Sequence, residues 1–396
     1  MQIILKLTTA CNLNCVYCSE GDCESKTLPT EIFFKLVDEF PAVLEQNKSR
    51  DAEFLFHGGE PMLYGRDNLK ILIDYAKSHL KNYNVRFLMQ TNGTLIDEDW
   101  IKFFKAENIS VGVSLDGYPE LHDKNRRTKN NEPTAEKVLQ NLKLMRDSGL
   151  KSGTLMVLNS AENIDTDKLF DFICENKLQP KIHSVIPCGR AANRKDSAEV
   201  YDAWIEIMKK LFTKSLAEDV PKIIQPLDEM MDAILGMSNL RECSYNGSCA
   251  KNFISLYPDG EVGFCGRDNF ARYLTYGNLQ EKSLLELYNS ANAKRIRARQ
   301  EFLKTHDCKN CSDWRLCHGG CAFEAVNFFG TLEAKYSNCE SRKKFIVWLR
   351  TEGLKILKET FIREKIHRRN SIKMKKEILS EIDFWQPEEV TTSAGT

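Results

Sequence analysis

The N-terminal stretch Gln2-Ile-Ile-Leu-Lys-Leu-Thr8 runs directly into Thr9-Ala-Cys11-Asn-Leu-Asn-Cys15-Val-Tyr-Cys18. Its first seven residues are mostly apolar strand formers, so the sequence predicts a strand followed by a loop that carries three cysteines. The spacing CxxxCxxC offers three thiolates, not four, to an iron–sulfur cube. One iron of such a cube keeps a free position for a further ligand.

Strands and helices alternate after this loop. Strands are predicted at 52–56, 85–90, 109–115, 153–158 and 181–186, and helices at 30–47, 68–80, from 97, at 134–148, at 165–176 and from about 198. Six strands alternating with six helices indicate parallel βα units joined by right-handed crossovers. The predicted fold class is α/β, a partial (β/α)6 TIM-like barrel with its chemistry at the C-terminal strand ends. A doubly wound sheet is the alternative that the pattern also allows.

Three more unusual loops follow the next three strands. They read Gly58-Gly59-Glu60-Pro61, Gln90-Thr91-Asn92-Gly93 and Ser114-Leu115-Asp116-Gly117. Paired glycines let the backbone approach a ligand closely, and Pro61 favours an extended Glu60. Because parallel strands end at one rim, we expect these loops to meet the cysteine loop there. The alternative for each loop is a simple turn without a functional role, because Gly, Asn-Gly and Asp-Gly are common in turns.

Composition narrows the class of protein. The 396 residues include 42% hydrophobic and 28% charged residues, and 56 basic residues balance 56 acidic ones, so no overall field indicates nucleic acid as a partner. We expect a cytoplasmic protein, because no export signal or membrane-spanning run is present. Fourteen cysteines in a reducing compartment indicate metal ligation, whereas an extracellular disulfide framework is the alternative.

A second group of cysteines lies in the region 243–339. Its members are Cys243, Cys249, Cys265, Cys308, Cys311, Cys317, Cys321 and Cys339. Pro258-Asp259-Gly260 predicts a turn between strands at 254–257 and 261–264, which would bring Cys249 and Cys265 together. Electron-transferring iron–sulfur clusters and structural zinc both suit such spacings.

The first three cysteines, with the Gly-Gly-Glu-Pro loop, resemble the signature of the radical SAM superfamily. The resemblance implies that Cys11, Cys15 and Cys18 hold a 4Fe–4S cluster whose open iron binds S-adenosylmethionine (SAM) and cleaves it to a 5′-deoxyadenosyl radical. It also implies a set of SAM contacts: Tyr17 near the adenine, backbone carbonyls of Gly58, Gly59 and Glu60 for the ammonium group, Asn92 and Ser114 for the ribose or carboxylate, and Arg126 for the carboxylate. A core aromatic is the alternative for Tyr17, and a solvated basic loop is the alternative for Arg126. If the three cysteines bound zinc instead of a cluster, His57 could supply the fourth ligand.

The second cysteine group resembles the SPASM extension of radical SAM enzymes that modify peptides and proteins. By this resemblance, two further 4Fe–4S clusters are held by Cys243, Cys249, Cys265 and Cys321 and by Cys308, Cys311, Cys317 and Cys339. The expected cofactors are therefore three 4Fe–4S clusters and SAM. Of the other cysteines, Cys23, Cys174 and Cys188, we expect ordinary packing.

The predicted domains follow from these motifs. They are a barrel at 1–196, a helical bridge at 197–242, a SPASM domain at 243–340, a C-terminal helical extension at 341–385 and a disordered tail at 386–396. One long helix over 341–382 is expected to make up most of the C-terminal extension. The basic stretch 363–376 suits an acidic leader peptide, although a solvated helix face is the simpler interpretation.

The resemblance to SPASM enzymes suggests two kinds of substrate. Ribosomal-peptide maturases form thioether or carbon–carbon crosslinks, and anaerobic sulfatase maturases form formylglycine. In the sulfatase maturases, an aspartate that acts as base follows the third SPASM cysteine, whereas here Cys265 is followed by Gly266-Arg267-Asp268. The sequence therefore favours a precursor-peptide crosslinking enzyme, with the sulfatase-type maturase as the alternative. The expected partners are the peptide, a flavodoxin or ferredoxin, and a separate leader-binding protein, with neither nucleic acid nor membrane. The alternative of another class is a zinc-stabilised, non-enzymatic binding protein.

Overall fold

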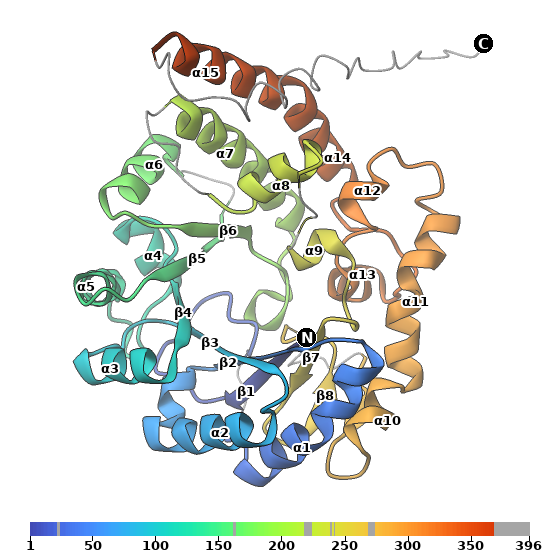
Figure 1. The fold of residues 1–396 in the computed structure, drawn as a ribbon. Coiled ribbons are helices and arrows are strands. Elements are labelled where there is room, and N and C mark those ends of the chain that lie inside the picture. Colours follow the sequence, from blue (N-terminus) through green and yellow to red (C-terminus); the bar gives the residue numbers. More distant parts are fainter. Residues whose placement is uncertain are drawn as a thin grey trace.

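A computed structural model describes residues 1–21, 24–160, 164–217, 224–237, 240, 242–267 and 274–367. Six parallel strands form a curved sheet in chain order, with helices along its outer side (Figure 1). The strands are β1 (Gln2–Thr8), β2 (Asp51–Gly58), β3 (Asn84–Thr91), β4 (Ile109–Ser114), β5 (Ser152–Leu158) and β6 (Pro180–Ser184). The prediction of a partial (β/α)6 barrel is confirmed, and its strand bounds differ from the prediction by at most two residues.

The outer helices are amphipathic, as their sequence periodicity predicts. They are α1 (Thr30–Gln46), α2 (Arg66–His79), α3 (Glu98–Glu107), α5 (Ala135–Asp147), α6 (Thr166–Glu175) and α7 (Ser197–Ala217). Asp97 caps α3 by accepting the backbone N–H of Trp100 at 2.8 Å. Side chains of β1 alternate: Ile3 and Leu5 are fully buried in the core, whereas Ile4 lines a cavity inside the barrel.

The cysteine-rich region extends the barrel sheet. Strand β7 (Phe253–Leu256) pairs in parallel with β1, from Gln2 opposite Phe253 to Leu5 opposite Leu256. Strands β8 (Glu261–Gly263) and β9 (Gly277–Asn278) follow in antiparallel order, which makes a nine-stranded sheet. The hairpin was predicted from its turn, where Gly260 has φ +82°. Its union with the barrel was not predicted.

Helices before and after this hairpin in the sequence carry several of the cysteines. They are α8 (Leu227–Ile234), α9 (Cys243–Asn246), α10 (Leu284–Tyr288), α11 (Ala291–Thr305), α12 (Trp314–Cys317), α13 (Ala322–Phe329) and α14 (Cys339–Trp348). A π turn at Leu349–Gly353 joins α14 to α15 (Leu354–His367), and both lie near α7 (Figure 1). The chain is helical without a gap from Cys339 to His367, which covers the described part of the helix predicted over 341–382. Residues 368–396, with the predicted tail and most of the basic stretch, lie outside the described residues.

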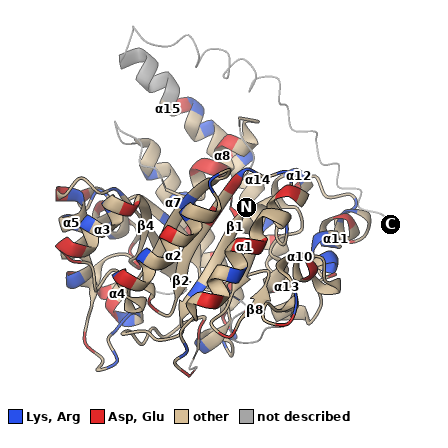
Figure 2. Cartoon of the chain, turned by 60° about the horizontal axis from the view of Figure 1, so that its bottom comes forward, with Lys and Arg blue, Asp and Glu red and all other residues tan. Residues whose placement is uncertain are grey.

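Three short elements sit at the loop rim: the 3-10 turns η1 (Pro61–Tyr64) and η2 (Gly189–Ala191), and the helix α4 (Pro119–Asn125). The sequence analysis treated the segment that includes α4 as a loop. Acidic and basic residues are interspersed along the helices, consistent with the balanced composition (Figure 2). Among the described helices, none is both long enough and apolar enough to cross a bilayer.

Candidate active site

A cavity of about 460 Å³ occupies the interior of the barrel. Eight cysteines line it: Cys188 and seven predicted cluster ligands, namely Cys11, Cys15, Cys18, Cys243, Cys249, Cys265 and Cys321. Three of these seven come from the loop after β1, and the other four come from the SPASM region. The structure thus brings two of the three predicted cysteine sets to one cavity, and its volume suits a small ligand with part of a substrate.

The cysteine loop is held in place by backbone contacts with neighbouring rim loops. The Asn14 N–H donates to the Arg127 carbonyl at 2.7 Å, and the Arg190 N–H donates to the Cys18 carbonyl at 3.0 Å. The Arg190 side chain also donates to the Cys15 carbonyl at 2.9 Å. Burial raises the pKa of the Cys11 thiol to about 12, so a bound cation is needed to keep that sulfur as a thiolate.

Tyr17 and Arg126 converge on Asp116, which the sequence analysis did not select. The Tyr17 hydroxyl and the Arg126 Nε both donate to Asp116 Oδ2, the latter at 3.0 Å, and the Arg126 guanidinium lies 5.4 Å from the Tyr17 ring centre. The Val157 N–H donates to the other Asp116 oxygen at 3.0 Å. Arg126 is only 8% exposed, so the interpretation as a solvated loop is wrong. Tyr17 and Arg126 both line the cavity.

The Gly-Gly-Glu loop packs against the cysteine loop. A Cβ atom on Gly59 would lie 2.2 Å from the Ala10 carbonyl oxygen, so only glycine fits this approach. The Glu60 N–H donates to the same carbonyl at 2.8 Å. Gly58 and Gly59 line the cavity, as the predicted SAM contact requires.

The Glu60 side chain does not line the cavity and instead holds neighbouring loops together. Its fully buried carboxylate accepts the Met62 N–H at 3.1 Å, the Thr91 hydroxyl at 2.7 Å and the Asn92 N–H at 2.8 Å. Burial raises its pKa to about 6 despite these donors. The Glu60 side chain thus ties the second rim loop to the third, and the contact expected of its backbone carbonyl with SAM stays a prediction.

Asn92 and Ser114 both line the cavity, as predicted. Asn92 Nδ2 donates to Asn12 Oδ1 at 2.8 Å and lies 3.9 Å from Cys11 Sγ. The Ser114 hydroxyl accepts a hydrogen bond from Gln90 Nε2 at 3.1 Å. These contacts place one side chain beside the cysteine loop and the other at the end of β4.

A buried polar group lies deeper in the barrel, and the sequence analysis missed it. Lys6, only 1% exposed, forms an ion pair with Glu20, and its Nζ lies 3.3 Å from His57 Nδ1. Burial lowers the pKa of His57 well below its usual value, which keeps the ring neutral. The signal for this group was a lysine inside an apolar strand.

The wall near the four SPASM cysteines is cationic. Arg267 lines the cavity, and its positive charge is attracted to the Cys243, Cys265 and Cys321 sulfurs when these are thiolates. Lys181 pairs with Glu242, whose pKa is held below its usual range by His183, Lys181 and Arg267 although burial opposes this. Asp268, the acid nearest in sequence to Cys265, lies outside the described residues.

The other four SPASM cysteines line a separate small hollow. These are Cys308, Cys311, Cys317 and Cys339, the second set implied by the resemblance to the SPASM extension. Helix α12 ends at Cys317 and α14 begins at Cys339. Among the described residues, no three His, Cys, Asp or Glu side chains stand close enough to hold one metal ion, so the four thiols border a hollow and not a point. All-thiolate sets of this kind suit iron–sulfur cubes.

The remaining cysteines are placed as follows. Cys174 is half-buried on α6 and packs against the core, as expected. Cys188 is buried but also lines the cavity. Cys23 lies outside the described residues.

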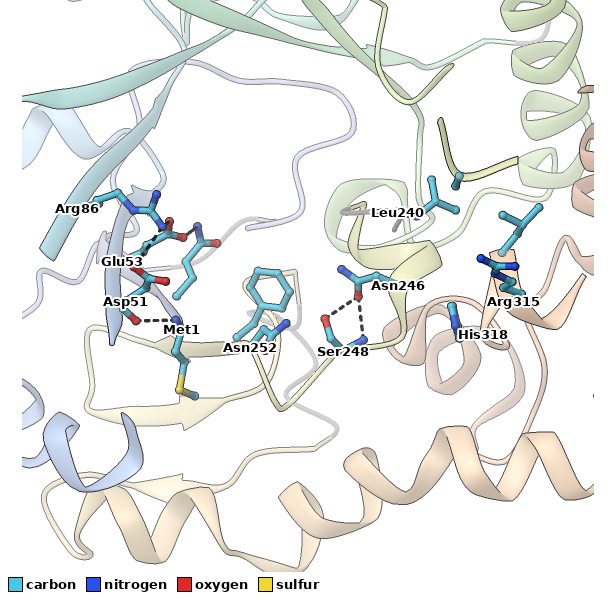
Figure 3. Close-up of a pocket in the computed structure, with 14 residues that line it drawn as sticks. Met1, Asp51, Glu53, Arg86, Leu240, Asn246, Ser248, Asn252, Arg315 and His318 are labelled. Carbon is cyan, nitrogen blue, oxygen red and sulfur yellow. Dashed lines mark hydrogen bonds and ion pairs between the residues drawn. The ribbon is translucent and has the colours of Figure 1, made fainter. Parts of the chain in front are cut away.

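A second, more open hollow of about 710 Å³ lies at the opposite, N-terminal ends of the strands (Figure 3). On one side stand Asp51, Glu53 and Arg86 of the barrel, and on the other Arg315 and His318 of the SPASM region. Gln2 and Phe253, which face each other across the β1–β7 pair, line both this hollow and the cavity. The two spaces therefore share a wall at the barrel floor.

Comparisons with known proteins agree with this geometry. Residues 5–173 match the model of the radical SAM superfamily, and residues 243–312 match that of the SPASM iron–sulfur cluster-binding domain. A cysteine-type anaerobic sulfatase-maturating enzyme of Clostridium novyi is 30% identical over 356 residues, which cover 87% of this chain and 93% of the relative.

Two solved structures share the fold. Native anSMEcpe with bound AdoMet matches with a TM-score of 0.76 and 23% identity over 91% of this chain and 98% of that one. Streptococcus suis SuiB bound to precursor peptide SuiA matches with a TM-score of 0.59 and 17% identity over 86% of this chain and 75% of that one.

These matches replace the alternative of a zinc-stabilised, non-enzymatic protein. Both matched domains are those of enzymes that use 4Fe–4S clusters and SAM, and the cysteines of this chain line one cavity and one smaller hollow. The chain belongs to the radical SAM superfamily, in the branch of enzymes that carry a SPASM domain.

Proposed function

We propose that this enzyme oxidises a side chain of a peptide or protein substrate, in the manner of an anaerobic sulfatase-maturating enzyme acting on a cysteine or serine. The observation that carries the proposal is the shared cavity. Cys11, Cys15 and Cys18 stand in the same cavity as the four cysteines of the first SPASM set. A substrate in it lies between the two, so a hydrogen atom can be removed on one side and an electron on the other.

The residues have distinct proposed roles. Cys11, Cys15 and Cys18 hold the SAM-binding cluster, and the two SPASM sets hold the auxiliary clusters. When bound, the first cluster would supply the electron that cleaves SAM, and the auxiliary clusters would accept electrons. Tyr17, Gly58, Gly59, Asn92, Ser114 and Arg126 form the SAM-binding wall, and Asp116 fixes the first and last of these.

Substrate class is supported by the relatives. The Clostridium novyi relative is named for sulfatase maturation, and SuiB is described in complex with a precursor peptide. A peptide substrate fits both. The reductant and any leader-binding partner stay predictions.

One observation favours peptide crosslinking as a second candidate. Gly266 stands where the sulfatase maturases have an aspartate base, and a Cβ there would meet Ile4 Cγ2 at 2.9 Å and Lys6 Cε at 3.4 Å. The described wall offers neutral imidazoles instead, because burial lowers the pKa of His183 to about 4 and that of His57 well below its usual value. The wall also includes the Glu20 carboxylate, which is paired with Lys6.

Anaerobic turnover tests the proposal. Reconstituted enzyme is incubated with SAM, dithionite and a synthetic sulfatase peptide that carries cysteine, or serine in its place, at the modified position. Mass spectrometry with hydrazide trapping is expected to find an aldehyde, in step with 5′-deoxyadenosine, and Cys11→Ala is the inactive control. Formation of 5′-deoxyadenosine with both peptides unchanged would exclude the sulfatase-type reaction and leave crosslinking of a precursor peptide.

A further inference from the structure

Arg342 is the largest fully buried side chain among the described residues, with 2% exposure. It lies on α14, three residues after Cys339, so one helix face carries both the thiol and the guanidinium. The guanidinium lies between two aromatic rings, 3.6 Å from the Tyr336 ring centre and 4.0 Å from that of Tyr245. Stacking on both faces fixes the plane of the guanidinium.

One edge of this guanidinium reaches a thiol of the second cysteine set, that of Cys317. Nη1 donates to the Ser244 carbonyl at 2.9 Å and lies 3.7 Å from Cys317 Sγ, within hydrogen-bond reach of sulfur. Nε donates to the Tyr201 hydroxyl at 3.5 Å. In the part of the chain that the structure describes, its acceptors are thus a carbonyl, a hydroxyl and a thiol, with no carboxylate among them.

A buried cation without a paired anion is costly. The charge of Arg342 attracts the buried carboxylate of Glu324, although no hydrogen bond joins these two described side chains. The anion within hydrogen-bond reach of Arg342 is the thiolate set of Cys308, Cys311, Cys317 and Cys339, through Cys317. The net negative charge of that set grows when a cluster held there is reduced. Hydrogen bonds to sulfur and nearby charge are the features by which a protein sets a cluster's reduction potential.

We propose that Arg342 is a positioning residue that raises the reduction potential of the second auxiliary cluster through its hydrogen bond to Cys317. This rests on the ligand sets of the proposed function. The favourable interaction strengthens as the cluster gains an electron, so the reduced form is stabilised over the oxidised one. Arg342 thereby makes this cluster a better electron acceptor than its four thiolates alone would.

Redox titration of the holoprotein tests the proposal without any substrate. The background is the full chain with Cys11, Cys15 and Cys18 changed to alanine, which is expected to hold about eight irons in two cubes. Arg342→Met and Arg342→Lys are compared with Lys343→Met, a change at the next residue on α14. Lys343 is a half-buried cation that borders the same hollow and attracts the Cys339 thiolate, but its hydrogen bond goes to Glu340. Iron content and the electron paramagnetic resonance signal of each reduced cluster are followed against potential.

In Arg342→Met, we expect one of the two clusters to show an about tenfold lower ratio of reduced to oxidised form at a fixed potential, which is 59 mV for one electron. The other cluster and the iron content stay as in the background, Arg342→Lys falls between, and Lys343→Met shows a much smaller change. Three results overturn the proposal: unchanged potentials in Arg342→Met, an equal shift in Lys343→Met, or loss of four irons in both Arg342 variants. A background protein with fewer than about eight irons instead contradicts the proposed ligand sets, and the role of Arg342 falls with them.

Discussion

Gly59→Ala is expected to disable the SAM-binding half of the site while leaving the rest of the molecule intact. The added Cβ would lie 2.2 Å from the Ala10 carbonyl oxygen and 2.6 Å from the Ala10 carbonyl carbon. Ordinary contact begins at 3.4 Å, so one backbone must move by about 1.2 Å. Both partners are backbone, so no side-chain rotation relieves the clash.

The displaced segment is the cysteine loop itself, since Ala10 directly precedes Cys11. A misplacement of about 1 Å at a reacting centre costs about a hundredfold in rate. The assay is anaerobic formation of 5′-deoxyadenosine from saturating SAM with dithionite, together with iron content. Gly59→Ala is expected to lose about two orders of magnitude in this rate and to keep the irons of both SPASM sites.

Gly153→Ala is the matched control. Gly153 lies in β5 with an ordinary backbone conformation, and a Cβ there would meet nothing within 4 Å. We expect its rate within about twofold of the original enzyme. If Gly59→Ala keeps full 5′-deoxyadenosine formation, the close approach of the two loops is not what positions the cluster.

Three further predictions concern the same cavity. Asp116→Asn removes the charge partner of buried Arg126 and is expected to lower the free energy of unfolding by about 3 kcal/mol in anaerobic urea titrations. Asp99→Asn is the control, because the ion pairs of Asp99 with Arg66 and Lys102 are exposed, and we expect no measurable change in the free energy of unfolding. Equal effects of the two substitutions would contradict the structure. Because the pKa of Glu60 is raised to about 6 in the folded protein, the folded state holds a proton that the unfolded chain releases between its ordinary pKa of 4.5 and about 6. Glu60 therefore stabilises the folded state below pH 4.5, and about 2 kcal/mol of the free energy of unfolding is lost as the pH rises to about 6. The original enzyme should lose this amount relative to Glu60→Gln between these two pH values. A difference in the free energy of unfolding that does not change with pH would refute the burial argument. In Gly266→Asp, the new Cβ meets only side-chain atoms of Ile4 and Lys6, so the variant should fold. If the sulfatase-type reaction is correct, Gly266→Asp should give a higher aldehyde yield from the cysteine peptide than Gly266→Asn, a variant of equal size. Equal yields would show that no base is missing at this position.

Local patterns made the barrel and the cysteine sets predictable. Hydrophobic periodicity is a property of neighbouring residues, so β1 and α1 could be placed to within a residue. Parallel strands must end on one rim, so the meeting of Cys11, Gly59, Asn92 and Ser114 followed from the order of the motifs.

Pairings between distant residues were not predictable in this way. Nothing near Lys6 indicates that Glu20 and His57 are its neighbours, and Asp116 reads as half of a common Asp-Gly turn. The role of the Glu60 side chain was missed for a similar reason, because the donors from Thr91 and Asn92 come from another strand end. The β1–β7 pair joins segments about 250 residues apart, beyond the reach of any pattern in either.

The parallel pairing of β7 with β1 sets a condition for building chimaeras from this family. Removing the chain after residue 242 would strip the partner from β1 and leave an apolar edge strand open to self-association. A SPASM domain grafted from another member must therefore present a strand that matches the register from Gln2 to Leu5, or the transplanted clusters will face a shifted barrel. Recombination that respects this seam exchanges substrate-handling parts, and recombination that ignores it yields aggregates.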